Sequence, residues 1–524
     1  MSRALVSFDT DKIKNYIFAT SALKEIVGAS ALIDDFNRRE MINIIQEKDP
    51  TAEKVFADAG AGLFDVKLEE AEAIVTAVEN EFKKKMITGS ISGAWIEQDR
   101  NGTFQETFKL LALRLREKKN AKNYSYVPFG ATSFTKTCTS CGSDYAQQKA
   151  PGIPEKGISV SEEEFLCSSC CAKREKDREM KKNLALLIQG KRDHNPLYLW
   201  DRLINALEKE LSEEHNNHFD AARPPETFSD LADLSEPSNY MALIYADGDS
   251  FGAELARSET IEDVKSFSET VDKCLFEALF SAILKHLPPK NDYFPFNLLF
   301  QGGDDLVMVT RADKGVEVAK ELCEHFAKNT SEVLGYPLTM SASVIITHGN
   351  YPFSSLIKLA EGSLSFAKMT GSRRKKDNPS DLNNQGFINF QVIHSSSGHH
   401  FQEEYKRIYT EETSNYRLIR TFRPYTCAEL EVLLELIKEF KAFPRNKLYA
   451  LQESLFMDYN NSVLHAMSFI PRLDKQNQGL INKALKSFAD NNKKCIPPWV
   501  SMGANNFYSP FMDIVELYSF IGRR

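Results

Sequence analysis

The sequence lacks any apolar run near the ~20 residues that a membrane-spanning helix needs, which argues against an integral membrane protein. Its start also lacks the basic segment and long apolar stretch of a signal peptide, because acids appear by Asp9 and Asp11. Basic residues are not in excess: 65 Lys and Arg stand against 73 Asp and Glu, a net charge of −8. This balance argues against a broad basic surface for free nucleic acid and leaves contact with RNA through partner subunits open. We therefore expect a cytoplasmic protein that has no membrane partner.

Cysteine is also scarce, with nine residues in a chain of 524. That number does not make a disulfide scaffold in a chain long enough to bury several cores. Five of the nine lie between Cys138 and Cys171, a clustering that favours metal binding in a reducing cytoplasm.

The clustered cysteines form two CxxC pairs, separated by residues 142–166. Two such pairs bring four thiolates into the tetrahedron that Zn²⁺ prefers, and nothing in the sequence completes an open catalytic position. The less favoured alternative is that the four thiols bind no metal, although they lie in a charged stretch of the chain. Cys171 is a fifth cysteine that could substitute for one of the ligands. We predict a structural zinc site with the ligands Cys138, Cys141, Cys167 and Cys170.

The order of predicted elements indicates an α+β fold with two ferredoxin-like units. Residues 239–395 follow the order β-α-β-β-α-β, and residues 1–129 follow the same order. Between them we expect a zinc-ribbon-like module over 130–172 and a helical insert with a linker over 173–238. Residues 396–524 are predicted to form a C-terminal helical domain.

The two ferredoxin-like units align as an internal repeat. When Leu63 is set against Leu306, Ala61 and Gly62 fall opposite the acids of a Gly-Gly-Asp-Asp segment. Asp9 then aligns with Asp247, and residues 91–96 align with residues 340–345, if the second unit is a few residues longer in the intervening segments. The first unit is therefore predicted to be a copy that has lost its paired acids.

Three aspartates of the second unit are candidate metal ligands, and two of them, Asp304 and Asp305, are also the candidate catalytic residues. Asp247 ends a predicted strand, and Asp304 and Asp305 lie in the turn of the neighbouring hairpin, so the three carboxylates should converge at one edge of the sheet. Their repulsion is removed by Mg²⁺ or Mn²⁺, and two such ions can activate a hydroxyl and steady a leaving oxygen. The main-chain carbonyl of Gly248 is a further candidate ligand. The alternative is a hairpin that merely has acidic turn residues.

Several residues around these acids are candidates for binding a nucleotide. Gly302 and Gly303 let the chain turn tightly and leave room above the turn. Asp249 and Ser250 follow the metal-binding strand, although Asp249 is also suited to capping the next helix. Lys368 is placed to reach a triphosphate from a helix, while the cations at 373–376 are individually more typical of a solvated basic loop.

Taken together, these motifs resemble the large subunit of type III CRISPR–Cas effector complexes, particularly the type III-B form. The resemblance covers roughly residues 1–375 and rests on residues 8–30, the zinc module, ADGDS (246–250), GGDDL (302–306) and residues 341–368. It implies two palm domains, the first degenerate and the second catalytic.

In that family the second palm joins ATP through 3′–5′ bonds into oligoadenylate messengers, usually cyclic, when the complex binds target RNA. The resemblance therefore implies ATP as substrate, and guide RNA, target RNA and other effector subunits as partners. It implies that Asp247, Asp304 and Asp305 bind the catalytic metal ions and that the first palm helps hold a second nucleotide.

This chain departs from the family in two places. The first histidine is His194 and no His-Asp pair occurs, so we expect no HD-type nuclease. Ser372 stands where the family often has a second lysine, which makes Arg373 a candidate phosphate ligand.

Two other functions compete with this one. A diguanylate cyclase also uses a Gly-Gly-Asp turn, but such proteins usually carry Glu where this chain has Asp305. The second competing function is that of a non-catalytic scaffold subunit of an RNA-guided complex. In that case the acids would remain from a catalytic ancestor and have no function.

Overall fold

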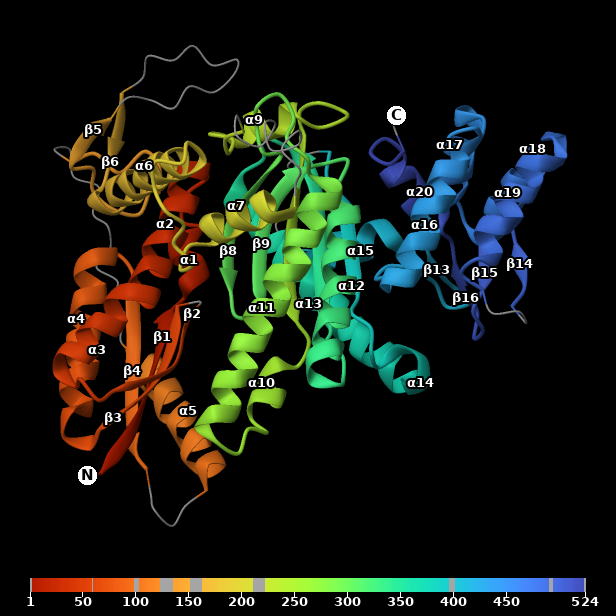
Figure 1. Cartoon of the computed structure of the whole chain (residues 1–524). Helices are drawn as coiled ribbons and strands as arrows, with labels where there is room; N and C mark the ends of the chain where they lie inside the picture. The colour runs from red at the N-terminus through yellow and green to blue at the C-terminus, as the bar shows by residue number, and fades with distance from the viewer. Residues whose placement is uncertain are drawn as a thin grey trace.

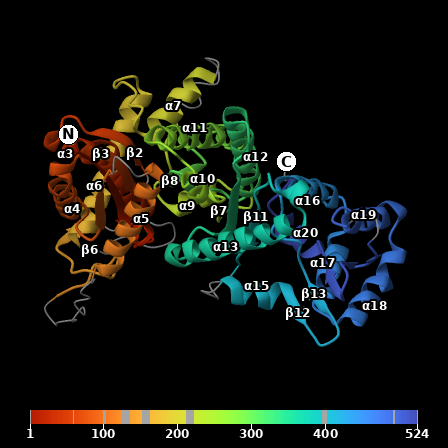
Figure 2. The ribbon, with the colours of Figure 1, turned by 90° about the horizontal axis from the view of Figure 1, so that it is seen from below.

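The computed structural model describes residues 2–58, 60–98, 103–122, 135–150, 163–210, 222–394, 401–489 and 493–522. Figure 1 shows the first α+β unit, the second α+β unit and the C-terminal region side by side in chain order. Figure 2 shows the same order from below, so the second unit lies between the other two.

The first unit is a four-stranded sheet with the strand order β2-β3-β1-β4, in which all neighbours are antiparallel. This is the ferredoxin-like arrangement that the sequence predicts. Its strands are β1 (Arg3–Asp11), β2 (Glu53–Asp58), β3 (Ala61–Lys67) and β4 (Ser90–Glu97). Its helices are α1 (Ile13–Ile17), α2 (Leu23–Asp35), α3 (Met41–Lys48), α4 (Ala71–Met86) and α5 (Phe104–Ala121), with a π-helical segment at Phe36–Glu40 between α2 and α3.

The second unit repeats this order and adds one strand, giving β11-β10-β7-β9-β8. The added strand β11 pairs parallel with β10, whereas the other neighbours are antiparallel. The strands are β7 (Tyr240–Gly248), β8 (Phe296–Gly302), β9 (Asp305–Arg311), β10 (Met340–His348) and β11 (Ile388–Val392). The helices are α10 (Phe251–Leu255), α11 (Ile261–His286), α12 (Gly315–Leu334), α13 (Phe353–Asp377) and α14 (Pro379–Leu382).

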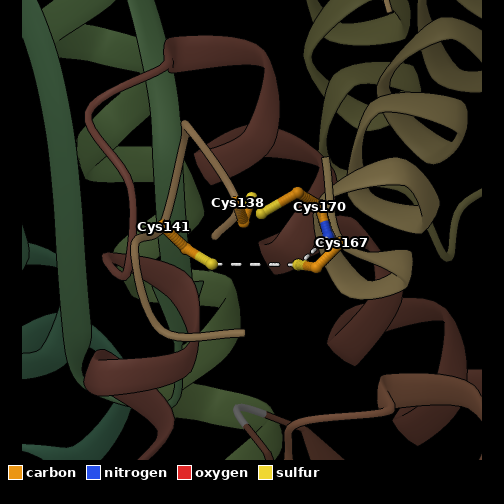
Figure 3. A group of neighbouring side chains, drawn as sticks. All are labelled: Cys138, Cys141, Cys167 and Cys170. Atoms are coloured by element: carbon orange, nitrogen blue, oxygen red, sulfur yellow. Dashed lines mark hydrogen bonds between the residues drawn. The ribbon is translucent and has the colours of Figure 1, made fainter. Parts of the chain in front are cut away.

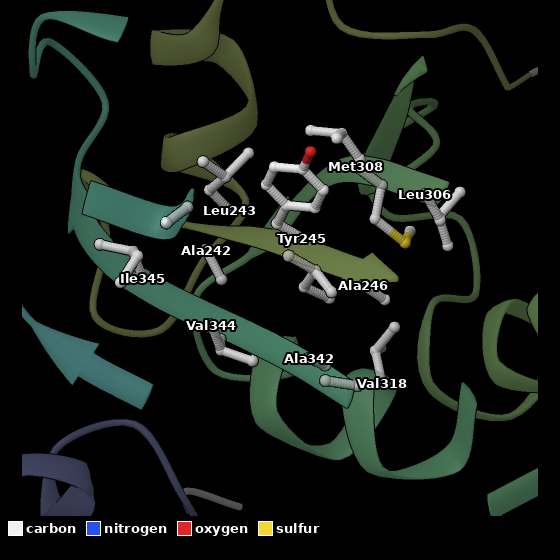
Figure 4. Packing of buried hydrophobic residues seen from close by; sticks show 14 of the residues in the cluster. Ala242, Leu243, Tyr245, Ala246, Leu306, Met308, Val318, Ala342, Val344 and Ile345 are labelled. Carbon is white, nitrogen blue, oxygen red and sulfur yellow. The ribbon is translucent and has the colours of Figure 1, made fainter. Parts of the chain in front are cut away.

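The central strand of the second unit is apolar along almost its whole length because both faces of the sheet are covered. Figure 2 shows α11 and α12 on one side of this sheet and α13 on the other. Figure 4 shows side chains of β7, β9 and β10 packed together, with Val318 of α12 against them. Helix α11 begins at a capping box formed by Thr260 and Asp263, which fixes where the chain leaves the loop after α10.

The two sheets pair their strands in the same register, which supports the internal repeat. Asp9 lies opposite Ser92 in the first sheet, and Asp247 lies opposite Ser341 in the second. These pairs are the ones that the sequence alignment places together.

At the hairpins the structure corrects that alignment by one residue. Gly62 and Leu306 hold the same register position in the two sheets, whereas the sequence alignment pairs Leu306 with Leu63. Gly60 and Ala61 therefore stand where the second hairpin has its paired acids. The error arose because hairpin turns tolerate one-residue shifts that a side-chain pattern alone does not reveal.

The zinc module packs on α2 of the first unit. It contains a two-stranded ladder of β5 (Gln148–Ala150) and β6 (Glu164–Leu166), followed by α6 (Ser168–Ile188). The proposed boundary at residue 172 therefore falls inside a helix. Two more helices, α7 (Leu199–Glu210) and α9 (Phe228–Asp233), lie in the insert, and α9 interrupts the predicted linker.

The C-terminal region is not purely helical, which corrects the prediction for 396–524. It contains a five-stranded sheet with the order β12-β13-β16-β15-β14. These strands have only two or three residues each, too few to show a period-two pattern in the sequence. They are β12 (Thr410–Glu412), β13 (Arg417–Ile419), β14 (Cys495–Ile496), β15 (Trp499–Ser501) and β16 (Asn506–Tyr508). The helices are α15 (Phe401–Tyr409), α16 (Cys427–Phe440), α17 (Arg445–Ser454), α18 (Tyr459–Phe469), α19 (Lys475–Lys486) and α20 (Phe511–Tyr518).

Candidate metal and nucleotide site

The three acids predicted to bind metal meet at the end of strand β7. Ala246 pairs with Leu306, so the next position along the same ladder sets Asp247 opposite Asp305. Asp304 lies in the turn between β8 and β9, where Gly302 pairs with Asp305. The side chains of Asp304 and Asp305 both interact with Asp247. The convergence expected from the sequence is therefore present.

These carboxyl groups are costly to ionise together. Burial, and next the negative charge of Asp247, raises the pKa of Asp304 to about 6 and that of Asp305 to about 8. A cation that binds here replaces these protons and removes the repulsion. The site is therefore built for a partner of positive charge.

We expect the affinity for Mn²⁺ to rise with pH between about 6 and 8, because metal binding requires the ionised acids. The same shifts lower the stability of the metal-free fold as pH rises through this window, since the unfolded acids, with a pKa of about 3.9, carry no proton there. Titration of Mn²⁺ against the protein at pH 6, 7 and 8, read by electron paramagnetic resonance, checks the first effect. An Asp305→Asn variant should flatten the pH dependence, and an equally steep dependence in that variant would contradict its assignment to Asp305.

Gly248 lies where any side chain would collide with the site. A Cβ there would stand 2.8 Å from Oδ2 of Asp304 and 2.2 Å from the ring of Phe251. At the turn, Gly303 has φ +58 and a Cβ there would meet nothing within 4 Å. The space above the turn is open, as expected for a place where a ligand approaches.

Lys368 reaches the site from the middle of α13. Its Nζ donates to Oδ2 of Asp247 and to the main-chain oxygen of Gly248, the latter at 2.6 Å. The ammonium thus contacts two of the groups predicted to bind metal. Helix α13 continues to Asp377, so the cations at 373–376 belong to a helix and not to a loop.

Asp249 is held by hydroxyl groups of the neighbouring chain. Thr339 Oγ1 donates to Oδ2 at 2.7 Å, and Ser341 Oγ donates to Oδ1 at 2.8 Å. Lys375 Nζ lies 3.7 Å from the same carboxylate. Asp249 therefore does not cap α10, whose N-cap residue is Ser250 in a left-handed conformation with φ 66. The role of both residues in nucleotide binding stays a prediction.

Arg373 is exposed on α13, where its Nη2 lies 3.9 Å from Sδ of Met369. The next residue, Arg374, is used elsewhere: it donates to Glu429 of the C-terminal region, with one contact at 3.2 Å, and to the main-chain oxygen of Pro424. Phosphate binding by Arg373 stays a prediction.

The sequence analysis missed a duplicate of this arrangement in the first unit. Ser92 and Ser90 donate to the carboxylate of Asp11, both at 2.8 Å, just as Ser341 and Thr339 donate to Asp249. Lys122 of the chain after α5 lies 2.8 Å from Asp11. The repeat alignment contained the signal, because Asp11 follows Asp9 as Asp249 follows Asp247.

A second residue that the sequence analysis missed is Lys14, which belongs to the first unit and contacts the second. Its Nζ lies 4.6 Å from the ring centroid of Tyr245 in β7 and 3.7 Å from Glu361 in α13. Its charge lowers the pKa of Asp305, against the larger raising effects of burial and Asp247. No local pattern marks this residue, since only the packing of one unit on the other brings it there.

The four predicted zinc ligands are gathered in one place, as Figure 3 shows. Their sulfur atoms all lie within 4.8 Å of one another. Within the part of the chain that the structure describes, no other group of three or more His, Cys, Asp or Glu side chains has its ligand atoms this close together. The three aspartates are thus spread more widely than the thiols. Cys171 is not one of this set.

The thiols influence one another strongly. Hydrogen bonds from Cys167 and Cys170 hold the pKa of Cys141 well below its usual value, while the bond to Cys141 raises the pKa of Cys167 to about 12. A shared set of protons of this kind is what Zn²⁺ displaces when it binds thiolates. The donor chemistry therefore fits a structural zinc ion.

The zinc module is anchored to the first unit through buried Glu25 of α2. Arg174 Nε donates to Glu25 at 2.6 Å, and Ser140 Oγ also donates to it. Ser140 lies between Cys138 and Cys141, so the anchor belongs to the knuckle itself.

Fold and site together define a pair of palm-type domains, one with three aspartates at the edge of its sheet and one without. Residues 240–377 match the family described as Cas10/Cmr2, second palm domain. A search of curated proteins found no match. No helix within the described ranges has the length and apolarity required to cross a bilayer.

Solved structures show the same fold over the whole chain. Csm1 from T. onnurineus matches with a TM-score of 0.56 at 15% identity, covering 100% of this chain and 70% of that one. A Csm1–Csm4 cassette in complex with pppApApA matches with a TM-score of 0.53 at 16% identity, and one in complex with cA3 with 0.53 at 13%, both with the same coverage. The resemblance to the large subunit of type III CRISPR complexes is thereby confirmed, and the choice of the type III-B form stays a prediction.

Proposed function

We propose that this chain is a metal-dependent nucleotidyltransferase that joins ATP through 3′–5′ bonds into cyclic or linear oligoadenylates or related adenylate messengers. The observation that carries the proposal is the meeting of Asp247 with Asp304 and Asp305 at the edge of the second palm. A scaffold subunit would have no need to keep three mutually repelling, partly buried acids.

The chemistry is the attack of one nucleotide's 3′-hydroxyl on the α-phosphorus of another, with pyrophosphate leaving. Bound Mg²⁺ or Mn²⁺ would supply activation of the hydroxyl and stabilisation of the leaving oxygen. The three aspartates and the carbonyl of Gly248 would hold the ions, and Gly303 keeps the turn free of side chains where the nucleotide approaches. Lys368 is within reach to neutralise phosphate charge.

The proposed partners are the other subunits of a type III effector with its guide RNA, and the proposed trigger is target RNA. The similarity of fold to Csm1 in Csm1–Csm4 cassettes supports this assembly. Arg374 of α13 donates to Glu429 and to the main-chain oxygen of Pro424 in the C-terminal region. This contact gives a partner bound to the C-terminal region a direct link to the catalytic palm.

A product assay tests the proposal. The reconstituted complex is incubated with ATP or GTP, Mg²⁺ or Mn²⁺, and with or without target RNA, and the products are resolved by mass spectrometry. We expect oligoadenylates and pyrophosphate from ATP only, with target RNA raising their yield. Products from GTP alone would favour a diguanylate-cyclase-like enzyme, and no pyrophosphate under any condition would favour a scaffold.

A further inference from the structure

The ammonium of Lys368 stands on the ligands of the candidate metal site. It donates to the carboxylate of Asp247 and to the main-chain oxygen of Gly248, the same two groups that would bind a divalent ion at the end of β7. A cation is therefore accommodated at this position, and it is supplied by the protein itself. Because two cations that approach the same oxygens repel each other, Lys368 and a metal ion compete for this position.

The first palm contains the same contact, which shows that it is a built feature of the fold. Lys119 of α5 donates to Oδ2 of Asp9 and, at 3.4 Å, to the main-chain oxygen of Thr10. Asp9 and Thr10 hold the register positions of Asp247 and Gly248. A lysine from the helix after the fourth strand thus reaches the same pair of oxygens in both palms.

The two palms differ in what surrounds that lysine. In the first palm each strand acid has its own lysine, Lys119 for Asp9 and Lys122 for Asp11. The charges there balance without any metal.

In the second palm Lys368 and Lys375 match the strand acids Asp247 and Asp249, but the hairpin adds Asp304 and Asp305. Lys14 of the first palm is a further cation whose charge acts on Asp305. The second site therefore has more carboxyl groups than the first, and more than its lysines can pair. Once these groups are ionised, their negative charge favours exchange of a single positive charge for a divalent one.

We propose that Lys368 is an exchangeable cation: it occupies one metal position in the metal-free protein and leaves it when a divalent ion binds, becoming available to nucleotide phosphate. In the first palm, where Gly60 and Ala61 replace the hairpin acids, Lys119 stays in place and no metal binds. The proposal rests on the metal site of the proposed function, and it makes Lys368 a competitor of the metal and not one of its supports.

Binding of Mn²⁺ to the full-length protein without nucleotide tests the exchange, with free Mn²⁺ read by electron paramagnetic resonance. Lys368→Met should bind Mn²⁺ about tenfold more tightly than the unmodified chain, because charge-assisted hydrogen bonds of this kind no longer oppose the ion. The same variant should bind ATP with Mn²⁺ more weakly, since its phosphate contact is lost. Unchanged or weaker Mn²⁺ binding would overturn the exchange.

Lys375→Met is the matched control, because it removes an equal charge from the same helix and faces Asp249 instead of Asp247. A gain in Mn²⁺ affinity as large as that of Lys368→Met would show a general field effect and overturn the proposal. Lys119→Met should create no additional Mn²⁺ site, and a new site would contradict the account of the first palm.

The outcomes also separate this inference from the proposed function. If the unmodified chain binds Mn²⁺ in a manner that depends on Asp305, and Lys368→Met does not bind it more tightly, only the exchange fails. If neither protein binds Mn²⁺, the metal site fails and both proposals fall with it.

Discussion

Replacing Asp304 and Asp305 by asparagine is expected to abolish oligoadenylate formation while making the metal-free protein more stable. The loss of product should exceed about 10³-fold, the scale expected when charged groups that act on the transition state are removed. The loss is measured as product per enzyme by mass spectrometry. Asparagine keeps the shape of the side chain, so the effect reports on charge and metal binding.

The gain in stability has a separate cause. Both acids have raised pKa values in the fold, so above pH 4 they oppose folding, and their removal should add several kcal/mol at about pH 8. Thermal unfolding with and without Mn²⁺ measures it. Glu262→Gln with Glu269→Gln, an equal loss of two exposed charges in α11, should change neither quantity. Full activity of the asparagine variant would contradict the assignment of the site.

Removal of the zinc ligands should unfold the zinc module and weaken the first palm. Structural zinc sites contribute about 10 kcal/mol or more to folding in small modules, and the described hairpin β5–β6 has little other core. We expect one zinc ion per chain by mass spectrometry and its loss in Cys138→Ser with Cys170→Ser.

The effect should spread to α2 because Ser140 and Arg174 both donate to buried Glu25. Hydrogen–deuterium exchange should show increased exchange in the zinc module and α2, with the C-terminal region unchanged. Cys171→Ser, next to the ligands but outside the set, should keep its zinc and its exchange pattern. Zinc retained by the double variant would contradict the ligand assignment.

The parts of the fold that the sequence predicted are those with a clear local pattern of apolar and turn-forming residues. The apolar strand before Asp247 and the strands flanking the hairpin of the second palm are short-range features, and their order defines the sheet. The C-terminal strands were missed because segments of two or three residues show no period. One of them, Arg417–Ile419, also pairs with Asn506–Tyr508, a segment distant in the chain.

The candidate site divides in the same way. Asp247, the hairpin acids and Lys368 were predicted because each stands next to a recognisable strand, turn or helix. Lys14 could not be predicted, since its place beside Tyr245 results from the packing of two domains. The one-residue shift of the first hairpin was missed for a related reason. The register of two strands is fixed by the hydrogen bonds between them, and the sequence does not reveal these bonds.

The sequence by itself determined the repeated palm, the acidic hairpin and the four-cysteine zinc site, because spacing along one strand or knuckle suffices to place those groups. Only the tertiary structure decided which charged groups meet. Lys368 contacts the oxygens of Asp247 and Gly248, and Lys119 contacts Asp9 in the first palm. Lys14 of the first palm contacts Tyr245 of the second. The reason is physical, since electrostatic partners are chosen by distances in space, and these follow from how helices and sheets pack.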